Sequence, residues 1–156
     1  MKAFDAVTAE HDATLGIIGD GPEAERLRRQ ARRLDHADQV TFLGFLVEYE
    51  AVLGHMRAAS VFASPSTREG FGITYAEAMA AGCLVVGADH PDPAADEVVG
   101  DAGYLPVPTR KGVAAAPDAG LSGQAPTGDP RERARQFDWG KVTDQAEEVS
   151  ERARAT

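Results

Sequence analysis

The sequence has 156 residues, a formal net charge of −9 and a single cysteine, Cys83. This length suits about one domain with its own core, and the sequence has no apolar stretch of the length that a membrane helix needs. The acidic charge argues against nucleic acid or an anionic membrane surface as the main partner, and one cysteine excludes an intrachain disulfide.

Short apolar runs alternate with helical patterns through the first third of the chain. Residues 14–20 and 39–45 have the composition of buried strands. Residues 22–36, which open on a proline and early acids, and residues 48–59, with apolar residues on one face, predict helices. We therefore expect each of these strands to be followed by a helix.

The same alternation continues to about residue 89. Residues 60–66 and 83–89 predict two further strands, and between them a glycine-rich loop leads into a helix that ends at Gly82. Strands without polar alternation, separated by helices, indicate a Rossmann-like parallel sheet with helices on both faces. The predicted fold class is therefore α/β.

The last third of the chain has a weaker pattern. Residues 96–108 predict a short helix, a turn and a short strand, and Pro117 and Gly120 are expected to interrupt the helical composition of residues 110–123. Residues 124–156 are predicted to form a C-terminal loop and a helical tail. We expect residues 1–156 to form one domain.

The turn after the first predicted strand offers one candidate motif. Gly19, Gly21 and Ala24 fit the dinucleotide pattern G-x-G-x-x-G/A. However, the next strand does not end with the acidic residue that would hold ribose, and Pro22 removes an N–H group from the helix end. A tight strand-to-helix turn is an adequate alternative.

The stretch "TREGFGITYAEAMAAG", residues 67–82, is the more informative motif. Thr74 and Glu77 fit a capping box, T-x-x-E, which would explain Glu77 structurally. That reading leaves Glu69 and the glycines Gly70 and Gly72 unexplained. Such a loop before a helix can turn several N–H groups toward an anion, and a carboxylate beside it suits sugar hydroxyls. The loop therefore suggests a ligand with both phosphate and sugar.

This stretch resembles the E-x7-E signature of the retaining, nucleotide-sugar-dependent glycosyltransferases of the GT-B fold, often called group 1 glycosyltransferases. Glu69 and Glu77 have that spacing, and "LGIIGDGPE", "QVTFLGF", "SVFASPS" and "GDAGYL" also look like the family, in its order. The resemblance covers about residues 1–152. It implies the C-terminal, donor-binding domain of a hexosyltransferase-type enzyme.

The resemblance also implies roles for individual residues. Glu77 would bind the ribose hydroxyls, and Glu69 would be the catalytic residue that lies close to the donor sugar. The donor substrate would be a nucleotide-diphosphate sugar, with no metal and no cofactor, and the protein would be soluble and cytoplasmic. The other expected donor-binding residues lie in the loops after the strands: Gly19, Phe45, Leu46, Arg68, Gly70, Phe71, Gly72, Ile73 and Thr74.

The sequence also departs from the family. No residues match the acceptor domain or the first strand of the donor domain, and no residues match the Arg and Lys that the family uses for the diphosphate. Arg68 is the expected cation beside the loop, and the charges of residues 109–112 are expected to lie elsewhere. Two hypotheses follow: a donor domain active only with an acceptor-domain chain, or a non-catalytic remnant or interaction module. Unpaired strand edges are expected to favour self-association.

Overall fold

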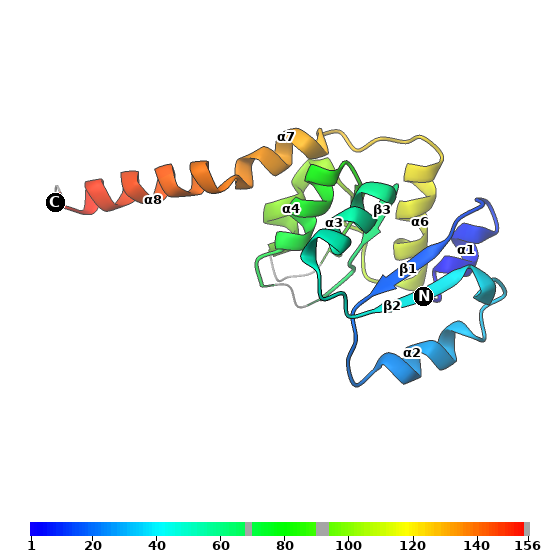
Figure 1. Cartoon of the computed structure of the whole chain (residues 1–156). Coiled ribbons are helices and arrows are strands. Elements are labelled where there is room, and N and C mark those ends of the chain that lie inside the picture. The colour runs from blue at the N-terminus through cyan, green and yellow to red at the C-terminus, as the bar shows by residue number, and fades with distance from the viewer. Residues whose placement is uncertain (68–69, 90–93, 155–156) are drawn as a thin grey trace.

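The computed structural model describes residues 1–67, 70–89 and 94–154. Glu69 and Arg68, two of the expected site residues, lie outside the described residues. The predicted α/β fold of parallel strands and helices is confirmed (Figure 1). In chain order the elements are α1 (Phe4–Thr8), β1 (Leu15–Ile18), α2 (Ala24–Ala31), the 3₁₀ turn η1 (Ala37–Gln39), β2 (Val40–Gly44), α3 (Tyr49–Ala58), β3 (Val61–Ala63), α4 (Ile73–Ala81), β4 (Leu84–Val86), α5 (Ala94–Val99), η2 (Gly100–Ala102), α6 (Arg110–Leu121), α7 (Pro130–Ala134), η3 (Arg135–Phe137) and α8 (Trp139–Arg154).

The described strands form two parallel pairs. β1 pairs with β2 from Leu15 opposite Val40 to Ile18 opposite Gly44, with one irregularity before Ile18. β3 pairs with β4, and an isolated parallel bridge joins Val86 of β4 to Tyr104. The helices α2 and α4 provide the crossovers within the two pairs, as parallel strands require.

Within the described residues, no strand pairing joins the β1–β2 pair to the β3–β4 pair. β1, β2 and β3 each have a strand neighbour on one edge only, whereas β4 also has the bridge to Tyr104. The resemblance implies an additional strand, and in the doubly wound order its place is between β1 and β3.

The core lies on the β3–β4 side of the molecule. Val85 and Val86 of β4 and Tyr75 and Met79 of α4 have no exposed surface, and Met56 of α3 joins the same cluster. The strand predicted in residues 14–20 forms as β1, but the prediction that it is buried is wrong, because its residues alternate between half-buried and exposed. A strand with an unpaired edge lacks the neighbour whose side chains would cover it.

The predictions for two helices need correction. The helix predicted for residues 22–36 is shorter, because α2 begins at Ala24 and ends at Ala31, where a turn carries the chain to η1. The predicted interruption of residues 110–123 is wrong, because α6 runs through Pro117 and Gly120 to Leu121. Ala116, beside the proline, is buried, and this packing outweighs the single N–H group that proline lacks.

Of the helices at the end of the chain, α7 and η3 pack on the body of the molecule, and only α8 leaves it (Figure 1). Phe137 of η3 packs against the core, and the Arg133 guanidinium lies 5.6 Å from the centre of its ring. Beyond it, α8 projects away from the rest of the protein as a single long helix (Figure 1).

Candidate functional site

The first part of the candidate site is the loop after β2. Gly44 ends the strand with a φ of 70°, in the left-handed region that favours glycine. The next residues are unusually apolar for an exposed loop, since Phe45 is 75% exposed and Val47 is 83% exposed, while Leu46 is half-buried. Exposed large apolar side chains that gather in one loop mark a binding surface more often than a single exposed one does.

The second part is the turn that begins α4. Gly72 is buried with a φ of 79°, and a Cβ atom there would lie 2.8 Å from the Tyr75 ring. Glycine is therefore required at this position by both conformation and space. Gly70 is exposed, and the side chains of Phe71 and Ile73 are 59% and 52% exposed.

The capping-box interpretation of Thr74 and Glu77 is wrong. α4 begins at Ile73, its N-cap is Gly72, and no side chain caps it by a hydrogen bond. Thr74 lies inside the helix and is exposed. Local helix capping therefore does not explain why a glutamate stands at position 77.

Tyr75 fixes this helix to the end of β3. Its side chain is completely buried, and its hydroxyl donates to the Ser64 carbonyl oxygen over 2.6 Å. Its ring also meets Phe62 of β3 edge to face, with 6.4 Å between the ring centres. The start of α4 is thus held against the carboxyl end of a strand, where open α/β sheets bind their ligands.

Glu77 connects the two parts of the site. The hydroxyl of Tyr49, the first residue of α3, donates to its Oε1 atom across 28 residues of sequence. The hydrogen bond to this carboxylate, with smaller contributions from burial and from the charges of Glu77 and Glu50, raises the pKa of Tyr49 to about 12. The hydroxyl therefore keeps its proton and donates throughout the physiological pH range. Sequence reasoning missed Tyr49, because no motif spacing relates it to Glu77.

The other predicted site residues are spread more widely. The ring of Phe71 contacts the ring of Phe137 edge to face, with 6.5 Å between the ring centres. Gly19 has a φ of 120°, and its N–H group donates to the Gly44 carbonyl oxygen over 2.8 Å. Gly19 thus joins the carboxyl ends of β1 and β2, as a tight turn would.

Two cations lie near the chain that follows β3, beside Pro65. A shallow, open pocket of about 200 Å³ has Lys2 and Arg110 in its lining, with Pro65 and Thr109. Pro65 lies two residues beyond β3, where the chain leads into the loop of residues 67–72. Thr109 and Arg110 thus lie beside Pro65, and the expectation that residues 109–112 lie away from the glycine-rich loop itself stays a prediction.

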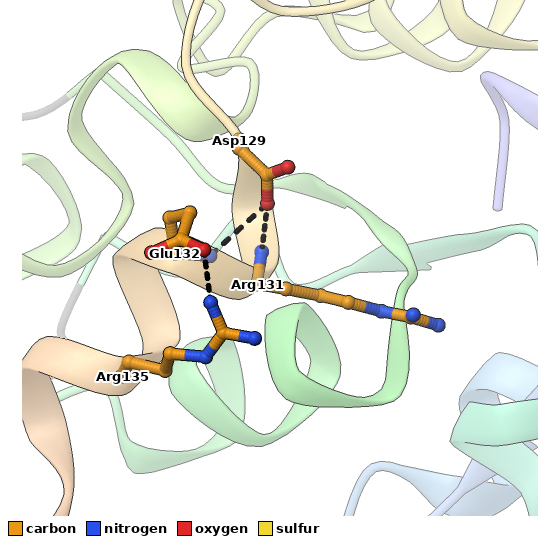
Figure 2. A network of polar contacts seen from close by, with 4 residues as sticks. All are labelled: Asp129, Arg131, Glu132 and Arg135. Carbon is orange, nitrogen blue, oxygen red and sulfur yellow. Dashed lines mark hydrogen bonds and ion pairs between the residues drawn. The ribbon is translucent and has the colours of Figure 1, made fainter.

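A polar cluster near the C-terminus has a structural role. Asp129 Oδ1 accepts from the N–H groups of Arg131 and Glu132 over 2.8 and 3.0 Å, and Glu132 pairs with Arg135 (Figure 2). The pKa of Asp129 is lowered, mainly because its carboxylate accepts these two backbone hydrogen bonds. Asp129 is the N-cap residue of α7, which has a proline in its first turn. Helix capping therefore accounts for the cluster without a ligand.

Two kinds of feature are absent from the described part of the chain. Within residues 1–67, 70–89 and 94–154, no three His, Cys, Asp or Glu side chains gather as a metal site would require. In the same ranges, no helix combines the length and apolar character needed to cross a membrane.

Sequence comparison places these features among known proteins. The profile described as glycosyl transferases group 1 matches residues 1–119. An alpha-monoglucosyldiacylglycerol synthase of Streptococcus pneumoniae is 36% identical over 102 residues, which cover 65% of this chain and 22% of that protein. A phosphatidyl-myo-inositol mannosyltransferase of Mycobacterium tuberculosis is 46% identical over 79 residues, which cover 50% of this chain and 20% of that protein. The chain therefore spans about a fifth of the length of these curated relatives.

Solved structures share the fold over nearly the whole chain. A sucrose-phosphate synthase of Thermosynechococcus elongatus matches with a TM-score of 0.76 at 25% identity, covering 99% of this chain and 42% of that one. HepE of Anabaena, solved with UDP and glucose, matches with a TM-score of 0.77 at 25% identity, and the match covers 96% of this chain and 44% of HepE. The C-terminal domain of a Francisella tularensis group 1 glycosyl transferase has a TM-score of 0.69 at 21% identity, covering 86% and 77%. The solved structures show the shared fold, and the profile match over residues 1–119 shows that the chain belongs to the glycosyl transferases group 1.

Proposed function

We propose that this chain is the donor-binding part of a retaining glycosyltransferase, and that it holds a nucleotide-diphosphate sugar between the loop after β2 and the start of α4. The observation that carries the proposal is the setting of Glu77. This carboxylate has no capping role, and Tyr49 links it to a loop with exposed apolar side chains. An acidic side chain beside an apolar surface suits a nucleoside, whose ribose donates hydrogen bonds and whose base stacks.

Each part of the donor has a proposed place. The base lies against Phe45 and Leu46, and the ribose hydroxyls donate to Glu77. The diphosphate and sugar lie at the start of α4, near the N–H groups of Gly70, Phe71 and Gly72, where the helix dipole favours negative charge. Ile73 and Thr74 line the first turn of this helix. Glu69 faces the donor sugar, and Arg68 and Gly19 remain proposed donor contacts.

A departing diphosphate needs compensating positive charge. The start of a helix offers only about half an elementary charge. Lys2 and Arg110 line the pocket that contains Pro65, two residues beyond β3. We propose that they face the diphosphate, together with Arg68. No metal or other cofactor has a role in this proposal.

Transfer to an acceptor hydroxyl needs more than this chain supplies. The acceptor must be positioned and water must be excluded, and in this fold family that task falls to a second domain. We propose that the chain alone binds a nucleoside diphosphate weakly and transfers no sugar, and that an acceptor-domain chain completes the enzyme. A sugar-nucleotide-binding module without catalysis is the second candidate, favoured by the open edges of β1 and β3, through which such a module could associate.

Glu77→Gln tests the proposal. Hydrogen bonds to a charged group contribute about 1.5–3 kcal/mol, so UDP or GDP should bind ~10- to 100-fold more weakly to the variant by calorimetric titration. The melting temperature should hardly change, because Gln keeps the shape and can still accept from Tyr49. Glu147→Gln on the projecting helix α8 is the matched control. Unchanged affinity in Glu77→Gln would refute the nucleoside site.

A further inference from the structure

Tyr49 has an unusual position for an exposed tyrosine. It is 55% exposed, yet its hydroxyl reaches a carboxylate on a different helix, Glu77 of α4. The helix that carries it is firmly anchored, because Met56, two turns further along α3, is buried in the core beside Tyr75 and Met79 of α4. Core packing therefore fixes the backbone on both sides of this hydrogen bond.

Glu77 gains a defined position from this contact. A glutamate side chain has several rotatable bonds, and holding it still on binding a ligand costs free energy. A donor on Oε1 limits the rotation before any ligand arrives, while a carboxylate offers about four lone-pair sites and can accept further hydrogen bonds. Two vicinal hydroxyls need such a carboxylate held in one orientation.

We propose that Tyr49 is a positioning residue that holds the Glu77 carboxylate ready for the two ribose hydroxyls of a nucleoside diphosphate. The inference rests on the proposed function, since it assigns Glu77 to ribose. Tyr49 also follows directly on the loop of residues 45–48, so the same contact couples the base side of the site to its ribose side. Its role is to favour ribonucleotides over deoxyribonucleotides.

The test is a set of calorimetric titrations with UDP and with 2′-deoxy-UDP. The proteins are the unmodified chain, Tyr49→Phe, Glu77→Gln and the double variant. Tyr49→Phe should bind UDP about 3- to 10-fold more weakly, the cost of immobilising one flexible side chain. It should lose most of the preference for UDP over 2′-deoxy-UDP. In the Glu77→Gln background, Tyr49→Phe should have less effect, because its action passes through the carboxylate.

Tyr104→Phe is the matched control, since it removes a hydroxyl that donates to the Gln124 carbonyl oxygen outside the site. Tyr49→Phe with unchanged UDP affinity, or with the same loss in both backgrounds, overturns the inference. If Glu77→Gln weakens UDP binding while Tyr49→Phe does not, only the role of Tyr49 fails. If Glu77→Gln leaves UDP binding unchanged, or if the unmodified chain binds no UDP, the ribose site itself fails and this inference with it.

Discussion

The two strand pairs have the same topology but very different burial. β4 lies against α4 and α6, and Phe62 of β3 meets the Tyr75 ring of α4. Val85 and Val86 of β4 are completely buried. β1 and β2 also form a parallel pair, with one irregularity, yet Ile18 is 40% exposed and no residue of either strand is buried. Hydrogen-bonded pairing alone therefore does not make a core. Apolar surface must also be covered on the faces of the sheet and at its edges.

The largest difference should appear when one large apolar side chain is shortened in each of the two regions. Met79→Ala removes a completely buried side chain and should lower the free energy of unfolding by about 2–5 kcal/mol. Ile18→Ala, in the open pair, should cost only about 1 kcal/mol. Urea denaturation measures both variants. Equal losses would show that the β1–β2 pair is covered in solution.

Adding a methyl group at a glycine tests the same difference between the two strand pairs. A Cβ atom at Gly103 would lie 2.7 Å from the Val85 backbone oxygen, so Gly103→Ala should destabilise by about 1–3 kcal/mol. At Gly16 of β1 the nearest atom would be 3.5 Å away, in ordinary contact. Gly16→Ala should therefore be neutral or slightly stabilising, because glycine weakens a strand. A loss at Gly16 as large as that at Gly103 would contradict this account.

Hydrogen exchange tests the open edges directly. Amides of β1 should exchange at least ~10-fold faster than those of β4, because exposed hydrogen bonds open locally at low cost. Native-state exchange followed by mass spectrometry resolves the two segments. Equal protection would mean that another chain or a second copy covers β1, and size-exclusion chromatography would then reveal the association.

The smallest effect concerns two helix caps. Asp129 caps α7, and Thr109 caps α6 through a hydroxyl that does not titrate. Because folding lowers the pKa of Asp129, its stabilisation is present above the unfolded pKa of about 3.9 and is lost as the pH falls through the lower folded value. Asp129→Asn should therefore flatten the acid side of the stability profile, whereas Thr109→Asn should leave its shape unchanged. An identical profile for Asp129→Asn and the unmodified chain would contradict the assignment.

The sequence predicted the order of strands and helices well because apolar runs and glycine turns are local signals. It did not predict the burial of β1, which depends on what lies beside the strand in space. The capping box that T-x-x-E spacing offered as an alternative explanation of Glu77 is wrong, because the backbone starts the helix at Ile73 instead. Tyr49 was missed for the same reason, since it reaches Glu77 through long-range packing.

The central claim is that a nucleoside diphosphate binds between the loop after β2 and the start of α4. Amide chemical shifts of the labelled chain, recorded by NMR as UDP is added, test this claim most directly. The account predicts that the largest changes occur at Phe45, Gly72 and Glu77, with saturation at one affinity. Changes confined to the apolar pocket lined by Tyr104, Leu105 and Ala115 would contradict it.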